Sequence, residues 1–221
     1  MNKNNTVVNL EEKTPINNYV WYASYGSNLN RERFLAYING TRAPGCDNTE
    51  KGCRDKSLPI QDRQVAIPHP LYFAKKASKW QGGGVCFIGE EDHTVNTLGR
   101  MYLITKEQFL DVVSQENSNI DVNEIDFIKL NKDRYFDMKK GWYGKIIYLG
   151  DVDGSPVYNF TSSKELKNEI NKPSESYLKC IVSGIKETYN LSDEEIADYF
   201  MSKVGIKEKC TRDELLGMIK Y

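Results

Sequence analysis

The chain has 221 residues, enough for one domain of good size with its own hydrophobic core. Its 30 basic and 31 acidic residues give a formal net charge of −1, so no basic excess points to nucleic acid or an anionic membrane as a partner. Residues 1–18 are polar and Asn-rich without the apolar core of a signal peptide, and no apolar run is long enough to cross a bilayer. These features predict a flexible N-terminus and a cytoplasmic location.

The cysteines do not form the pattern of a disulfide framework, because their number is odd and their spacing irregular. They are Cys46, Cys53, Cys86, Cys180 and Cys210. The only two histidines stand apart from them, so we expect no zinc site.

The first predicted element is a strand over residues 20–25, which are rich in aromatic and β-branched side chains. It breaks at residues 26–28 (Gly-Ser-Asn), and residues 29–35 predict the start of a helix. Glycine permits a positive φ or a close approach of a ligand to the backbone, and Ser and Asn turn or cap the chain. Such a turn presents N–H groups to a carboxylate, carbonyl or phosphate, although its spacing alone fits an ordinary connection better.

A long polar stretch over residues 39–62 follows, which we expect beside the mouth of a pocket. Two short strands come next, separated by Pro68 and Pro70, and this pattern favours a sheet edge, a bend or a bulge. The three glycines of residues 82–84 precede another strand. They indicate a close backbone approach or a sharp bend, or equally simple flexibility.

Residues 97–104 predict a strand that leads directly into a helix. Thr105 and Gln108 have the spacing of a capping box at the start of that helix. Residues 125–130 fit a strand or a helix equally well.

Residues 144–150 and 155–160 predict a β-hairpin, because an Asp-Gly turn joins them. From residue 174 the pattern is helical, and residues 190–221 form a small helical appendage. Strands with segregated helices indicate the α+β class.

Five stretches, in order, resemble the γ-glutamylcyclotransferase-like family. They are residues 25–29 (Tyr-Gly-Ser-Asn-Leu), 80–85, 98–104, 109–117 and 173–177. The resemblance covers about residues 19–188. It implies a small, mixed, barrel-like sheet with flanking helices over residues 19–189, a fold that periodicity alone does not establish.

The resemblance also implies an activity. In this family the α-amine of a γ-glutamyl group attacks the γ-carbonyl, expels the amine attached there and yields 5-oxoproline, as an acyltransferase- or lyase-type enzyme. The site must hold a near-attack conformer, move protons through one acid/base group and stabilise the carbonyl oxygen. No metal or other cofactor is implied. The implied partner is a small γ-glutamyl compound, not nucleic acid or a membrane. The compound itself, and whether the protein is a monomer or a homodimer, stay open.

By its match to the Gln-Glu pattern of the family, Glu116 is the candidate acid/base. The residues alone also fit a solvated carboxylate at a helix C-terminus, a place that the helix dipole mildly disfavours. If Glu116 is partly buried, its pKa should rise toward a useful range.

The resemblance implies that backbone N–H groups of the loop bind the glutamyl end of the substrate. It also implies that Tyr25 reaches into the same pocket. The loop residues are Gly26, Ser27, Asn28 and Leu29. For Tyr25, a role as a core aromatic fits the alternating strand at least as well.

Further candidates have two interpretations each. Tyr177 closes the pocket or orients Glu116, or simply packs its helix. Trp80 is a pocket wall or a core residue. Arg100 pairs with a substrate carboxylate or, better supported for a lone arginine beside a strand, forms a structural ion pair.

Two departures from the family pattern bear on substrate choice. Asn117 stands where a glycine is common, and residues 39–62 and 190–221 have no counterpart that we can match. A binding or regulatory module without turnover is therefore an alternative function, as is an amide hydrolase that uses the same carboxylate to activate water.

Overall fold

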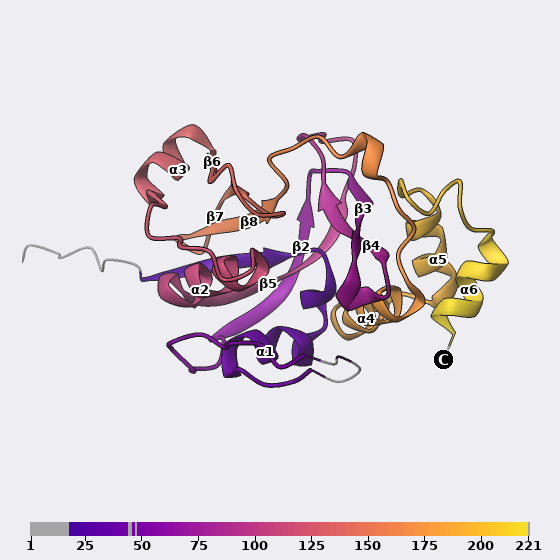
Figure 1. Cartoon of the computed structure of the whole chain (residues 1–221), viewed down its shortest axis with the longest axis horizontal. Coiled ribbons are helices and arrows are strands. Elements are labelled where there is room, and N and C mark those ends of the chain that lie inside the picture. The colour runs from indigo at the N-terminus through magenta and orange to yellow at the C-terminus, as the bar shows by residue number, and fades with distance from the viewer. Residues whose placement is uncertain (1–17, 44–45, 47, 221) are drawn as a thin grey trace, which may run out of the picture.

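The computed structural model (Figure 1) describes residues 18–43, 46 and 48–220. All but the last residue of the predicted flexible segment 1–18 lies outside these residues. The strands are β1 (Tyr19–Ser24), β2 (Gln61–Ile67), β3 (Leu71–Ala77), β4 (Gly83–Ile88), β5 (Thr97–Thr105), β6 (Tyr135–Asp137), β7 (Lys145–Val152) and β8 (Ser155–Thr161). The helices are α1 (Arg31–Asn39), α2 (Lys106–Glu116), α3 (Phe127–Asp133), α4 (Glu175–Thr188), α5 (Asp193–Met201) and α6 (Arg212–Ile219). Short 3-10 turns are η1 (Ser27–Leu29), η2 (Ser78–Trp80) and η3 (Lys167–Glu169).

A mixed six-stranded sheet with the order β2-β5-β1-β8-β7-β6 is the frame of the fold, and β3 and β4 form a separate pair. Strand β1 pairs antiparallel with β5 and parallel with β8. Within the described residues the larger sheet ends at β2 and β6, so no closed barrel forms. The α+β class is confirmed, whereas the barrel-like closure is not.

Alternating side chains of β1 divide the core in two, because successive residues of a strand face opposite sides. Val20 and Tyr22 pack with Phe109 in the cluster under α1 and α2. Trp21 and Ala23 belong to the other cluster, toward β3, β4 and α4. The end of β1, where the loop begins, therefore lies between two packed layers.

Most helices and strands predicted from the sequence are present in the structure. Residues 125–130, for which the sequence fits a strand or a helix equally well, contribute to helix α3. Its N-cap, Asp126, accepts hydrogen bonds from the N–H groups of Ile128 and Lys129. Strands β7 and β8 form the predicted hairpin, and Asp153 and Gly154 both have positive φ at its turn, at 50° and 74°. Strand β2 is an edge strand, as the nearby prolines indicated.

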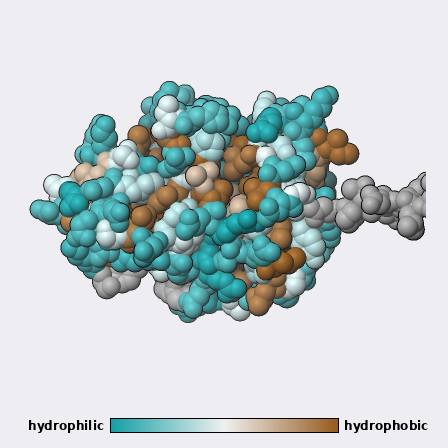
Figure 2. All heavy atoms as spheres, turned by 180° about the vertical axis from the view of Figure 1, so that it is seen from behind, coloured by the Kyte–Doolittle hydropathy of each residue, from teal (hydrophilic) through white to brown (hydrophobic). Residues whose placement is uncertain are grey.

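The C-terminal helices pack on the rest of the chain. Ile196 and Phe200 of α5 and Leu215 of α6 are fully buried, in the same cluster as Phe73 of β3. The predicted boundary near residue 189 stays a prediction. The rear face of the molecule is largely hydrophilic, with apolar side chains in separate patches (Figure 2). No helix in the described part of the chain has the length and apolar character of a membrane span.

Candidate functional site

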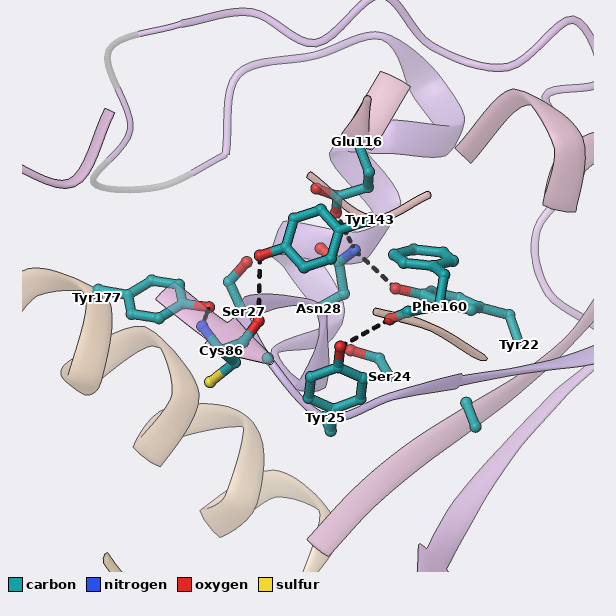
Figure 3. Close-up of a pocket in the computed structure, with 12 residues that line it drawn as sticks. Tyr22, Ser24, Tyr25, Ser27, Asn28, Cys86, Glu116, Tyr143, Phe160 and Tyr177 are labelled. Atoms are coloured by element: carbon teal, nitrogen blue, oxygen red, sulfur yellow. Dashed lines mark hydrogen bonds between the residues drawn. The ribbon is translucent and has the colours of Figure 1, made fainter. Parts of the chain in front are cut away.

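Glu116, the last residue of α2, faces the loop that follows β1 (Figure 3). The Asn28 side-chain nitrogen donates to Glu116 Oε1 at 2.9 Å and to the Tyr22 hydroxyl at 3.2 Å. A small cavity of about 40 Å³ lies here. Its lining comes from several elements and comprises Tyr22, Ala23, Ser24, Tyr25, Gly26, Ser27, Asn28, Cys86, Glu116, Tyr143, Phe160 and Tyr177. The fold thus brings together candidates that lie far apart in the sequence.

The loop meets the cavity through Gly26, Ser27 and Asn28, but not through Leu29. The Leu29 N–H donates to the Gly26 carbonyl at 3.0 Å, and its side chain is 1 % exposed, away from the cavity lining. A substrate donor at Leu29 stays a prediction, but the 3-10 turn already uses that N–H. The N–H groups of Ser27 and Asn28 open the turn and have no carbonyl of a preceding turn to bind.

Gly26 has little room for a side chain, whereas its φ of −114° does not call for glycine. A Cβ atom here would lie 3.2 Å from the Tyr177 hydroxyl, which accepts a hydrogen bond from the Cys86 N–H at 3.1 Å. Tyr177 therefore forms the wall of the cavity beside Gly26. Its hydroxyl binds the Cys86 N–H and not Glu116, which it would have to contact to orient that carboxyl group. Trp80 packs against the Tyr177 ring at 4.9 Å between centroids and lines the adjoining cleft.

We expect Gly26→Val to lower the free energy of unfolding by about 1–3 kcal/mol and to weaken ligand binding at the cavity, because the new side chain displaces the Tyr177 hydroxyl. Gly217→Val is the matched control: a Cβ at Gly217 of α6 meets nothing within 4 Å, so stability should stay within about 0.5 kcal/mol. Urea unfolding of both variants measures the difference. Equal stability and binding would show that the close contact at Gly26 is unimportant.

Tyr25 lines the cavity while its hydroxyl donates to the Phe160 carbonyl at 2.7 Å. It combines the two alternatives, since its side chain is also 6 % exposed and part of the core. The sequence did not single out Tyr143, which forms another wall. Asn117 holds Tyr143 in place, accepting from its N–H at 2.9 Å and donating to its carbonyl at 3.2 Å. The φ of Asn117 is −109°, so this position has no need of glycine.

Glu116 is half-buried, and burial raises the pKa of its carboxyl group. The positive charges of Arg33 and Lys79 and a hydrogen bond from Tyr37 oppose this rise in pKa. Arg33 donates in turn to the Tyr37 hydroxyl at 3.0 Å. The sequence analysis did not identify Arg33 and Tyr37 as site residues, although they lie one turn apart on the helix that follows the loop.

A wider cleft of about 310 Å³ adjoins the cavity and shares four of its lining residues, Ser27, Glu116, Tyr143 and Tyr177. Its remaining lining is Arg33, Tyr37, Glu50, Lys76, Ala77, Ser78, Lys79, Trp80, Val85, Gln115 and Trp142. Glu50 comes from the 39–62 stretch, which therefore reaches this cleft as expected. Glu116 therefore borders both the small cavity and the wider cleft.

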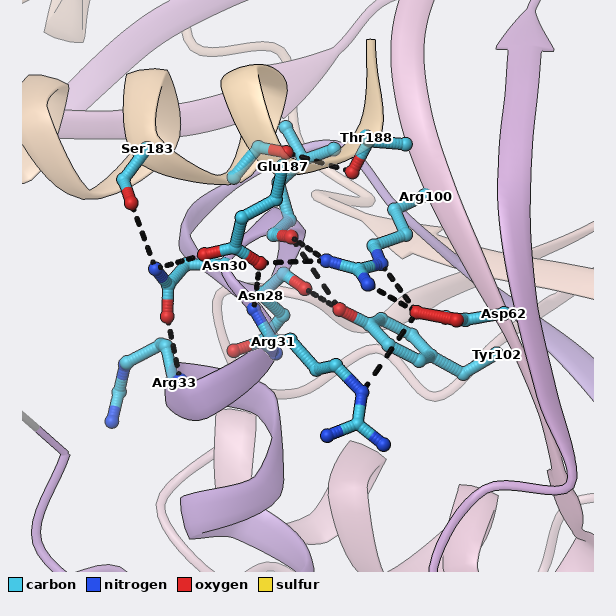
Figure 4. Close-up of polar contacts among 12 residues, drawn as sticks. Asn28, Asn30, Arg31, Arg33, Asp62, Arg100, Tyr102, Ser183, Glu187 and Thr188 are labelled. Carbon is cyan, nitrogen blue, oxygen red and sulfur yellow. Dashed lines mark hydrogen bonds and ion pairs between the residues drawn. The ribbon is translucent and has the colours of Figure 1, made fainter.

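Arg100 lies outside the cavity and forms the structural ion pairs that the sequence favoured (Figure 4). It is 8 % exposed and pairs with Asp62 and with Glu187, the latter at 2.8 Å. Arg100 also donates to the Leu29 carbonyl at 3.2 Å, and the Tyr102 hydroxyl donates to the Asn28 carbonyl at 2.8 Å. These groups hold the loop from behind.

Helix α4 supports the same side of the loop. A Cβ atom at Gly184 would lie 2.2 Å from the Asn30 backbone nitrogen, so only glycine permits this approach. Glu187 accepts from the Asn30 side chain at 2.9 Å and from the Arg31 N–H at 3.1 Å. The loop is thereby fixed between α4 and β5.

Comparison with known proteins gives a sequence relative and several structural neighbours, two of which are described here. A histone deacetylase 5 from Arabidopsis thaliana is 34 % identical over 203 residues, which cover 84 % of this chain and 31 % of that protein. The chain thus spans about a third of its length. A gamma-glutamyl cyclotransferase has a TM-score of 0.41 at 17 % identity, covering 77 % of this chain and 80 % of that one. An uncharacterized protein from Homo sapiens has a TM-score of 0.48 at 16 % identity, covering 92 % and 99 %. No family model matches the chain.

One structural neighbour is a γ-glutamyl cyclotransferase, the family that the five sequence motifs resemble. Both TM-scores lie below 0.5 and both identities below 20 %, so nothing about the activity of this chain follows from the likeness. The motifs themselves lie around the site: the loop after β1, the β4 region, α2 and the start of α4 reach the cavity or the cleft. The motif in β5 lies behind the loop, where Arg100 and Tyr102 bind its carbonyl groups.

No group of three or more His, Cys, Asp or Glu side chains within the described residues could hold a metal ion. Cys86 lines the cavity, but burial raises the pKa of its thiol to about 12. The sulfur is therefore a neutral thiol near pH 7, as a small core residue would be.

Proposed function

We propose that this protein is a cofactor-independent γ-glutamylcyclotransferase-type enzyme that releases 5-oxoproline from a γ-glutamyl amide. The observation that carries the proposal is the contact between Glu116, half-buried at the end of α2, and Asn28 of the Gly-Ser-Asn loop. The contact supports the proposal because the carboxyl group of Glu116, whose pKa burial raises, lies beside a loop that would supply backbone donors.

The glutamyl end of the substrate would enter the small cavity. The N–H groups of Ser27 and Asn28 suit the glutamyl carboxylate or the reacting carbonyl oxygen. The Asn28 side-chain oxygen is buried without a hydrogen-bond partner in the described structure, so it suits the substrate's α-ammonium group. The inner cavity is too small for a whole γ-glutamyl amide, so the departing amine would extend into the wider cleft.

In the proposed reaction, Glu116 takes a proton from the α-ammonium group. The free amine attacks the γ-carbonyl carbon, forming the ring C–N bond and a tetrahedral oxyanion. Glu116 then gives this proton to the departing nitrogen as the old C–N bond breaks, and a second proton from the ring nitrogen follows the same route. Two protons thus move from the α-nitrogen to the amine that leaves as an ammonium ion, and the ring nitrogen keeps one.

The surroundings of Glu116 suit a group that must both accept and donate a proton. Burial raises its pKa from the ordinary value, while Arg33 and Lys79 limit the rise. A carboxyl group with a pKa closer to neutral pH is protonated more often near pH 7 than an ordinary glutamate. It can therefore both take a proton from the amine and donate one to the leaving nitrogen. The neighbouring phenols of Tyr37 and Tyr143 stay neutral, because burial raises their pKa values well above 10.

The test is product analysis over a panel of γ-glutamyl dipeptides and γ-glutamylamines with the purified protein. We expect 5-oxoproline and the released amine in equal amounts, without added metal or nucleotide. Free glutamate as the product would support the hydrolase alternative. Binding without any product, over the whole panel, would support the binding or regulatory module instead.

A further inference from the structure

Two cations that line the wider cleft, Arg33 and Lys79, bind the carboxylate of Glu50. Glu50 Oε1 accepts from Arg33 Nη1 at 2.6 Å and from Lys79 Nζ at 2.6 Å. The Arg33 side chain is 3 % exposed, that of Glu50 is 12 % exposed and that of Lys79 is 28 % exposed. Arg33 and Lys79 come from α1 and η2, whereas Glu50 comes from the segment between α1 and β2. The contact therefore joins three separate parts of the chain within the cleft.

An arginine and a lysine that converge on one point form a site for a carboxylate or another anion. Their hydrogen bonds and charges hold the pKa of Glu50 below its ordinary value despite the opposing effect of burial, so Glu50 is ionised near neutral pH. It already occupies the position that an anionic group of a ligand would take. Lys76 also lines the cleft, but as a single exposed cation it attracts anions only weakly in salt.

The rest of the cleft offers aromatic surface. Trp142 lines it and is 40 % exposed, and Trp80 and Tyr37 form further walls. Such walls suit an apolar or aromatic group without charge.

We infer that Glu50 is a specificity-determining residue, which fills the anion position formed by Arg33 and Lys79 and selects γ-glutamyl amides whose departing amine is apolar or aromatic and carries no carboxylate. This inference rests on the proposed function, since it assigns the cleft to the departing amine. A ligand carboxylate has to displace Glu50 from both cations or lie beside its negative charge. Displacement would also disturb Arg33, which holds Tyr37 next to Glu116.

The experiment compares γ-glutamylphenylalanine with γ-glutamylphenylalaninamide, which differ only in the carboxylate of the departing amine. Affinity is measured by calorimetry and kcat/KM by 5-oxoproline release. We expect the wild type to prefer the amide by at least about 10-fold, and Glu50→Gln to shift the ratio toward the carboxylate by about 10-fold or more. Glutamine keeps an oxygen acceptor for the two cations, so the fold should survive. Adding Lys79→Gln to Glu50→Gln should remove most of the gain.

Glu32→Gln is the matched control, because Glu32 is an exposed glutamate of α1 outside the cleft lining, and its ratio should equal that of the wild type. A wild-type preference for the carboxylate would overturn the inference without any variant. An unchanged ratio in folded Glu50→Gln would overturn it too, while 5-oxoproline release would still support the proposed function. If no compound releases 5-oxoproline, the proposed function fails. In that case the inference is judged by calorimetry alone, and equal wild-type affinities for γ-glutamylphenylalanine and γ-glutamylphenylalaninamide would overturn it.

Discussion

Replacing Glu116 by glutamine is expected to lower kcat by about 10²–10⁴-fold while leaving substrate affinity nearly unchanged. This loss corresponds to roughly 3–5 kcal/mol of activation free energy. Glutamine keeps the size of the side chain and an oxygen that can accept the Asn28 hydrogen bond. It cannot take a proton from the α-ammonium group, so the attacking amine would not be generated.

The measurement pairs calorimetric binding with product release on the same preparation. Glu107→Gln is the control, because Glu107 lies on the exposed first turn of the same helix, α2. Its turnover should match that of the wild type. Turnover of the folded Glu116→Gln variant near the wild-type level would move the acid/base role to another residue.

The same variant has an expected effect on stability. Because burial raises the pKa of Glu116, the native state binds the proton of this carboxyl group more tightly than the unfolded chain, in which glutamate has a pKa of about 4.3. The stabilising effect of the proton is complete below the unfolded pKa and is lost as the pH rises through the folded pKa. Glutamine does not titrate, so Glu116→Gln should gain stability relative to the wild type between pH 4 and pH 7. Urea unfolding at both pH values measures this gain, and an unchanged difference would mean that the carboxyl group is not destabilised by burial.

Replacing Arg100 by methionine is expected to lower the free energy of unfolding by about 3 kcal/mol and to reduce turnover beyond that effect. The variant leaves Asp62 and Glu187 without their buried cation, and such unpaired charges cost about 3–5 kcal/mol. The lower end applies here, because the two carboxylate side chains are 29 % and 34 % exposed. Turnover should fall because the Leu29 carbonyl loses its hydrogen bond and Asn28 shifts relative to Glu116.

Arg31→Met is the matched control for this network. Arg31 lies 4.0 Å from the same Asp62, but its side chain is 43 % exposed, so its removal should cost less than about 1 kcal/mol. Turnover is measured at a temperature where all variants are folded. A role limited to stability predicts wild-type kcat and wild-type pH dependence for folded Arg100→Met. A positioning role predicts a lower kcat and a pH profile shifted with the surroundings of Glu116.

Local patterns in the sequence predicted much of the fold because caps, turns and periodicity act over a few residues. The Thr105 capping box and the Asp-Gly hairpin are examples, and both are present. The sequence did not predict the 3-10 turn at Leu29, which uses an N–H group that a simple helix start would leave free. The open edges at β2 and β6 depend on long-range pairing, which no local pattern specifies.

The candidate site was predicted where its residues lie in recognisable motifs, as for Asn28 and Glu116. Tyr143 and Glu50 come from irregular segments, and they reach the site only because distant contacts hold those segments. Asn117 fixes Tyr143, while Arg33 and Lys79 hold Glu50. Such contacts join residues 17 to 29 positions apart, so the sequence alone gave no sign of them.

The most direct test of intramolecular cyclisation is turnover in water labelled with oxygen-18. When the substrate's own amine attacks the γ-carbonyl, every oxygen of the 5-oxoproline comes from the substrate. Mass spectrometry should therefore find unlabelled 5-oxoproline with the wild type and almost no product with Glu116→Gln. Labelled glutamate, which carries one oxygen from water, would contradict cyclisation and assign Glu116 to the activation of water.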